Sequence, residues 1–78
     1  MSIDDYFYGK YKNLGRNIQK YRLEKGLSQE KLSELIDANL KFIGHIERLE
    51  RKPSFDKFLL IAYVLGVEPG DLLKNPDD

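Results

Sequence analysis

Apolar residues recur along most of this chain at the three-and-four spacing that marks one face of a helix. The first series has steps of three, four and three residues and consists of Tyr11, Leu14, Ile18 and Tyr21. Gly26 then suits the left-handed conformation that ends many helices, and Leu27 can fold back on the last turn. No useful stretch alternates with a period of two, so the pattern predicts an all-α chain of five short helices.

A pair of short helices is predicted next, with a connection of about three residues. The first of the pair spans Gln29–Ile36 and is capped by Ser28. The second spans Asn39–Arg48, is capped by its first residue, and buries a narrow stripe made by Ile43 and Ile46. So short a connection forces a large angle between the helices. That is the geometry of a helix-turn-helix, which presents its second helix to the major groove of DNA.

The remaining pattern completes one domain with a segment on either side. Ser54 caps a fourth helix that Gly66 ends, and Pro69 begins a short fifth helix. These boundaries predict a helix-turn-helix domain over residues 13–74 and a frayed tail over 75–78. Residues 1–12 form an N-terminal extension that is too apolar for a solvated tail. We expect part of it to pack or to dimerise, through Ile3, Tyr6, Phe7, Tyr8 and Tyr11.

Composition and charge exclude several classes of function, although the net charge alone says little about the partner. The chain has 78 residues and no net charge, but Lys10–Lys25 holds six cations against one anion and Glu68–Asp78 holds one cation against four anions. A basic face can therefore coexist with an acidic end. With no cysteine and a single histidine, no metal site, cofactor or nucleophile–base pair can be assembled, so we expect no enzyme. The longest apolar run, Phe58–Leu65, is too short to cross a bilayer, and the acidic N-terminus does not read as a signal peptide, so a cytoplasmic location is expected.

The residues around the second helix of the pair are the candidates for DNA contact. Apolar side chains can read thymine methyl groups, lysine can donate to guanine, and histidine can donate or accept. The predicted base-edge residues are Leu40, Lys41, Phe42 and His45. Phe42 has an equally good alternative as a core residue. Amides and cations at helix ends and in loops suit phosphates. The predicted phosphate contacts are Gln29, Asn39, Arg51 and Lys52, with Arg16 as an additional candidate.

Several motifs resemble the Xre-type helix-turn-helix family of phage repressors, Cro proteins and small bacterial regulators. They are Leu14-Gly15-Arg16-Asn17-Ile18, Gly26-Leu27-Ser28-Gln29, Ile43-Gly44-His45-Ile46-Glu47-Arg48 and Lys52-Pro53-Ser54. The resemblance covers roughly residues 14–73 and implies a compact, lambda-repressor-like five-helix domain. It also implies a structural ion pair between Arg22 and Glu47. The family usually has glycine where Asp37 stands and glycine where Leu49 stands, so the exit from the second helix of the pair should be extended or redirected here.

The leading hypothesis is a sequence-specific regulator of transcription, a repressor, that binds double-stranded DNA as a homodimer on a pseudo-palindromic operator. The dimer interface is predicted at the exposed edge of the fourth helix and at Val67, Leu72 and Leu73. No small-molecule ligand is evident. Within this class, a phage repressor, a controller of a restriction–modification operon and an antitoxin stay open. The alternative class is a protein-interaction module, or an antitoxin that needs its protein partner.

Overall fold

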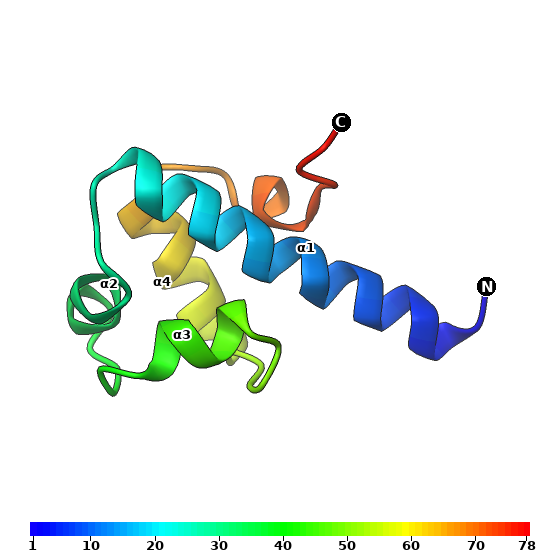
Figure 1. Ribbon diagram of the computed structural model, residues 1–78, viewed down its shortest axis with the longest axis horizontal. Coiled ribbons are helices and arrows are strands. Elements are labelled where there is room, and N and C mark those ends of the chain that lie inside the picture. Colours follow the sequence, from blue (N-terminus) through cyan, green and yellow to red (C-terminus); the bar gives the residue numbers. More distant parts are fainter.

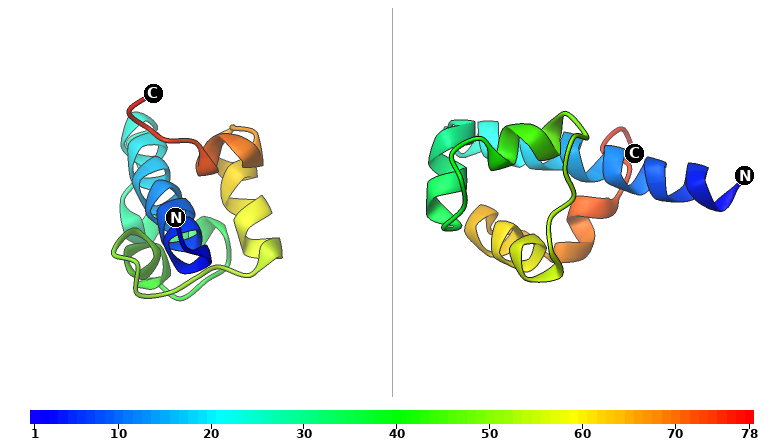
Figure 2. Two further views of the ribbon diagram at one scale, coloured as in Figure 1. Left: turned by 90° about the vertical axis from the view of Figure 1, so that its right-hand side faces the viewer. Right: turned by 90° about the horizontal axis from the view of Figure 1, so that it is seen from below.

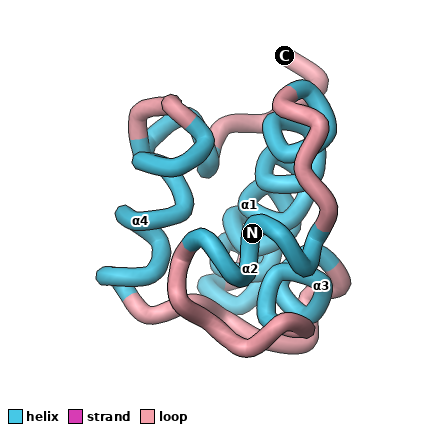
Figure 3. Tube along the Cα trace, turned by 90° about the vertical axis from the view of Figure 1, so that its left-hand side faces the viewer, coloured by secondary structure: helices cyan, strands magenta, loops and turns pink.

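The computed structural model describes all 78 residues and is entirely helical (Figure 1). Four α-helices and a closing 3₁₀ helix follow one another as α1 (Ile3–Glu24), α2 (Gln29–Leu35), α3 (Phe42–Glu47), α4 (Phe55–Leu65) and η1 (Pro69–Leu73). The predicted all-α fold is confirmed, with the fifth predicted helix present as the single 3₁₀ turn. In Figure 3, α3 and α4 lie on opposite sides of the molecule. No helix is long and apolar enough to cross a membrane.

The first helix begins well before Tyr11, the first residue of the predicted series. It begins at Ile3, because the Ser2 side chain accepts a hydrogen bond from the Asp5 backbone N–H at 3.1 Å and caps the helix. The N-terminal extension is therefore not a separate segment but the first turns of α1, and these turns extend past every other element (Figure 2). The expectation that the extension packs holds only near Tyr11, since Ile3, Tyr6, Phe7 and Tyr8 are exposed.

A single core lies between the helices. Its buried apolar residues are Leu14, Ile18, Leu32, Ile36, Phe42, Ile43, Ile46, Ile61, Ala62, Leu65 and Leu72. Every α-helix and η1 contributes to it, so removing one element would expose apolar surface on the others. Gly26 and Gly66 hold positive φ angles after α1 and α4, as predicted.

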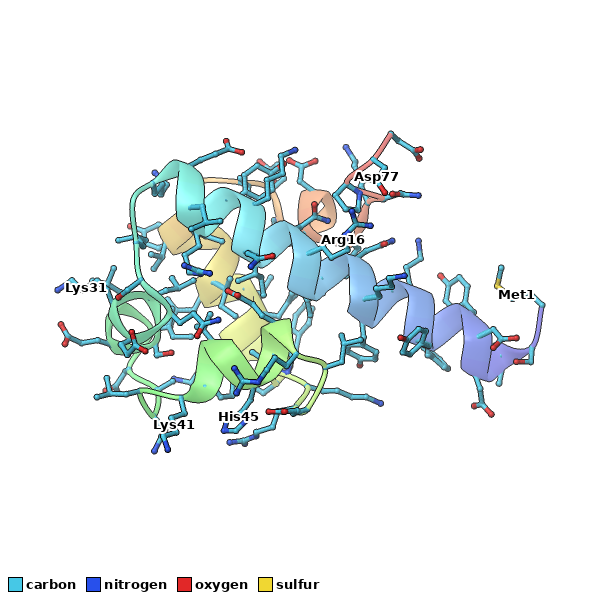
Figure 4. The ribbon with its side chains drawn as sticks, viewed as in Figure 1. Met1, Arg16, Lys31, Lys41, His45 and Asp77 are labelled. Carbon is cyan, nitrogen blue, oxygen red and sulfur yellow. The ribbon has the colours of Figure 1, made fainter.

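The chain closes by returning to α1. Asn17 Nδ2 donates to the carbonyl oxygens of Leu72 at 2.9 Å and Lys74 at 2.7 Å. The Leu72 side chain is completely buried against this helix. Its prediction as a dimer contact is therefore wrong, because the side chain is already used within the subunit. The tail beyond it is also tied down, since Asp77 forms a bidentate ion pair with Arg16 (Figure 4).

The connection between α2 and α3 is longer than predicted, so α3 is shorter. Asn39 does not cap α3: its Oδ1 accepts from the Lys41 N–H at 2.9 Å and closes a separate turn. The helix begins only at Phe42. Asp37 adopts the left-handed conformation at φ 56°, as its place in the turn predicted. Lys57 Nζ fixes this turn to α4 by donating to the carbonyl oxygen of Asp37 at 3.1 Å.

Candidate nucleic-acid interface

A buried hydrogen-bonded ion pair fixes the orientation of α3. Arg22 of α1 donates from Nε to Glu47 Oε2 at 2.8 Å and from Nη2 to Glu47 Oε1 at 3.1 Å. Both side chains are more than nine-tenths buried. Arg22 also donates to the Leu27 carbonyl oxygen at 2.9 Å. The pair that the family resemblance implied is therefore present, and its bidentate geometry restrains both the position and the rotation of α3.

Gln29 completes this cluster instead of facing outward. Its Nε2 donates to Glu47 Oε1 at 2.9 Å, and the side chain is only partly exposed. Gln29 was predicted to contact a DNA phosphate, but in the structure its amide donates to Glu47 of α3 instead. The carboxylate of Glu47 is likewise surrounded by donors and presents no free anion to the surface.

A glycine lets α1 and α3 approach closely. A Cβ atom on Gly15 would lie 3.1 Å from the Ile46 carbonyl oxygen and 3.2 Å from that of Glu47. Both neighbours are backbone atoms of α3, so a Cβ atom at Gly15 could be accommodated only by moving the helix itself. The sequence contained this glycine in the family-like motif, but its role depends on a crossing that the periodicity does not show.

The outward side of α3 and of the turn before it forms a polar and basic surface. We call it the recognition face and define it by Leu40, Lys41, His45 and Arg48. Leu40 is 54% exposed, and the Lys41 and Arg48 side chains are open to solvent. Lys41 and His45 point away from the body of the protein (Figure 4). Lys41, His45 and Arg48 follow each other by four and three residues, which places them on one side of the helix.

Two predictions for this region need correction. Phe42 is 7% exposed and belongs to the core, so it is not a base-edge contact. It turns inward because α3 begins at Phe42, which places Phe42 one turn before Ile46 on the buried stripe. Arg48, by contrast, was not among the predicted contacts. Its spacing from Lys41 and His45 could have identified it once the limits of α3 were known.

Gly44 lies beneath the recognition face. A Cβ atom there would be 3.0 Å from Arg48 Nη1 and 3.0 Å from Gln29 Oε1. A glycine inside a helix costs about 1 kcal/mol relative to alanine, so its presence here needs a packing reason. Within the subunit it is two side chains that close over the glycine and bury it.

One carboxylate lies among these cations. Glu50 Oε1 is 2.7 Å from His45 Nδ1 and 3.3 Å from Arg48 Nη2. The hydrogen bond with His45, together with the Arg48 charge, holds the pKa of Glu50 below its usual value. The carboxylate is therefore ionised at neutral pH, and a phosphate that approaches His45 or Arg48 must compete with it.

The chain leaves α3 through a strained residue that redirects it. Leu49 has a φ of 65°, in the left-handed region where the family resemblance leads one to expect glycine. The helix is not extended, since it ends at Glu47. Beyond the bend, the Arg51 guanidinium lies 5.2 Å from the ring centre of Phe42, and Lys52 Nζ lies 4.6 Å from that of Tyr11. Both residues remain exposed beside the recognition face.

Arg16 is the predicted phosphate contact that lies elsewhere. Its guanidinium is bound to Asp77 at 2.9 Å and 3.1 Å, near the C-terminus of the chain (Figure 4). The structure therefore gathers Leu40, Lys41, His45, Arg51 and Lys52 around α3, leaves Asn39 in the turn before it, and separates Arg16 from them.

The sequence is similar to those of known proteins. The profile of the helix-turn-helix family matches residues 18–72. Control protein C.BamHI of Bacillus amyloliquefaciens is 42% identical over 60 residues, which cover 76% of this chain and 74% of that protein. Control protein C.SmaI of Serratia marcescens is 33% identical over 60 residues, which cover 77% of this chain and 71% of that protein.

Solved structures are similar over most of the fold. The hypothetical transcription factor NHTF from Neisseria has a TM-score of 0.82 and 26% identity, with 87% of this chain and 78% of that chain covered. The restriction-modification controller protein C.AhdI from Aeromonas hydrophila has a TM-score of 0.74 and 34% identity, with 80% and 94% covered.

Proposed function

The chain belongs to the helix-turn-helix family of DNA-binding transcriptional regulators, and we propose that it reads a specific operator by placing α3 in the major groove. The observation that carries this proposal is the combination of a buried clamp and a free outer surface. Arg22 and Glu47 hold α3 from inside, while Lys41, His45 and Arg48 face outward, the last two beside Glu50. A helix that is rigidly held yet polar on its outer side is what base reading requires.

Within the recognition face, different side chains would contact different parts of the duplex. Lys41 and His45 supply donors for base edges, and the exposed Leu40 suits a thymine methyl group. Arg48, Arg51 and Lys52 surround them and suit phosphates, which fix register without reading sequence. Asn39 uses its oxygen within the turn, so its amide NH₂ is left to donate to a phosphate.

We further propose that the regulator acts as a homodimer through the outer side of α4. Phe55 is 71% exposed, Leu59 38% and Tyr63 82%, and their spacing of four residues makes one apolar stripe. Val67 and Leu73 lie at the partly buried margin. A stripe of large apolar side chains in water is typical of an interface. A two-fold dimer would read two half-sites centred about 34–36 Å apart.

The similarity to C.BamHI, C.SmaI and C.AhdI favours one of the regulators that the sequence left open. We propose that this chain controls transcription of a restriction–modification operon, by occupying its promoter as a repressor. Nothing in the structure favours an antitoxin or an interaction module over this role.

Selection of duplexes from a randomised DNA library tests the proposal. The expected result is an inverted repeat whose affinity falls steeply with salt, with a log–log slope of about −0.9 for each phosphate neutralised. Lys41→Ala should relax preference at one base position, while Lys52→Ala should weaken all duplexes alike and reduce the slope by about one. No enrichment, or the same effect from both variants, would overturn the proposal.

A further inference from the structure

The first turns of α1 carry an apolar face that is exposed from Ile3 to Tyr8. We call residues 3–11 the α1 arm. Ile3 is 71% exposed, and Tyr6 and Phe7 are each 51% exposed. The family profile begins only at residue 18, so the α1 arm lies outside the part of the chain that defines the family. An exposed patch of large apolar side chains indicates a contact with another molecule.

The surface beside the α1 arm is hollowed on both sides of Phe7 and Tyr11. A groove of about 280 Å³ separates the arm from residues 49–52, with Tyr8 and Leu49 among its lining residues. A second groove of about 390 Å³ separates it from the start of α4 and is lined by Tyr6, Phe55 and Phe58 among others. Phe7 and Tyr11 therefore form a ridge between a hollow whose lining also includes Asp4, Arg51 and Lys52 and a second, mainly apolar hollow. The side chains of another helix can pack into this shape.

We propose that the α1 arm pairs antiparallel with the α1 arm of a second copy of this chain. If a two-fold axis passes at Phe7, each residue lies opposite a residue of the second copy, and the two residue numbers add up to 14. Ile3 then lies opposite Tyr11, and Asp4 lies opposite Lys10. At about 100° per residue, these four positions fall within about 60° of Phe7 around the helix. One face thus carries an apolar centre, an acidic end and a basic end, which makes it complementary to itself.

The charges of the α1 arm favour this occupant over nucleic acid. Asp4 and Asp5 stand at its tip, where they would repel a phosphate backbone. In the self-pairing, Asp4 instead meets the ammonium of Lys10. Within the subunit the Lys10 Nζ lies 5.6 Å from the centre of the Tyr6 ring, about 100° around the helix from Phe7, so it turns toward the partner on pairing. Asp5 points to the opposite side of the helix, about 160° from Phe7, and takes no part.

This pairing adjoins the proposed stripe on α4 at Phe55, which lines the second groove, but it does not use Leu59 or Tyr63. Two different two-fold interfaces on one chain join dimers into tetramers or longer assemblies. Sedimentation equilibrium measures the mass of the 78-residue protein in solution. Over micromolar to hundreds of micromolar protein, this mass reports association through either interface. Tyr63→Lys removes the α4 contact at a point remote from the α1 arm, so the association that remains in this variant is the one to test.

Charge reversal supplies the decisive comparison within the Tyr63→Lys background. Asp4→Lys and Lys10→Asp should each raise the dissociation constant at least tenfold, and the two together should restore it. Asp5→Lys is the matched control, since it makes the same charge change in the same turn on the opposite face. Asp4→Lys combined with Lys25→Asp has the same net charge as the restoring pair but should not restore association.

The outcomes separate clearly. A monomeric Tyr63→Lys variant with an intact α1 arm would overturn the proposal. Equal effects of Asp4→Lys and Asp5→Lys, or no restoration by the double reversal, would also overturn it. Selection of DNA with the Asp4→Lys variant tests the function independently, because the recognition face is untouched and sequence preference should persist.

Discussion

Loss of the Glu47 carboxylate is the perturbation that tests most directly how α3 is held. Glu47→Met would leave the Arg22 guanidinium more than nine-tenths buried, with only the Leu27 carbonyl oxygen still accepting from it. Breaking a buried pair by removing one partner costs about 3–5 kcal/mol, because the remaining charge is uncompensated. The whole stability of a chain of this size is about 4–12 kcal/mol. The single variant should therefore be close to unfolding at 25 °C.

The double variant Arg22→Met with Glu47→Met should behave differently. Two methionines fill the space with flexible apolar side chains and leave no charge buried. Its loss of stability should be about 1–2 kcal/mol, well below the sum of the two single changes, which gives a coupling of at least about 2 kcal/mol. Gln29 loses its acceptor in both cases, but its partly exposed amide can turn to water.

Urea unfolding followed by helical circular dichroism measures these differences. With a slope of about 1 kcal/mol per molar urea, a loss of 3 kcal/mol moves the midpoint by about 3 M. Sucrose can be added equally to all variants to bring the least stable one into range. A cost below about 1 kcal/mol for Glu47→Met, or a double variant as unstable as the sum of the singles, would refute the view that this pair holds α3.

Three further predictions follow from the contacts around this centre. Gly15→Ala should lower stability by about 1–3 kcal/mol in the same urea assay despite the better helix propensity of alanine, since its Cβ would press on the α3 backbone; unchanged or higher stability would contradict the close crossing. Glu50→Gln should tighten binding of the selected operator about fivefold at low salt, as expected for removing one unit charge about 4 Å from a phosphate. Weaker binding would instead show that Glu50 orients His45 for its contact with DNA. Because Arg16 lowers the pKa of Asp77, the stability that this pair contributes should be present above about pH 4 and lost as the pH falls through the folded-state pKa. An Asp77→Asn variant should therefore be less stable than the parent at neutral pH and equally stable in acid. A constant difference in the free energy of unfolding at all pH values would contradict this origin.

Features that depend only on neighbouring residues could be predicted from the sequence. Helical periodicity predicted the all-α fold, and the caps Ser28 and Ser54 and the left-handed Gly26 and Gly66 lie where they were expected. These signals are local, because a cap or a positive φ is satisfied within one turn of chain. The resemblance to a known family added the Arg22–Glu47 pair, which no local rule contains.

Whether a given side chain faces the core or the surface depends instead on the packing between helices. Phe42 and Leu72 are buried in the core, and Gln29 donates a hydrogen bond to Glu47. Each of these residue types could equally have served a DNA or dimer contact. The α1 arm shows the reverse case, in which aromatic residues stay exposed because nothing else in the chain reaches them. Periodicity fixes the faces of a helix relative to one another, but which face is buried depends on helices distant in sequence that pack against it.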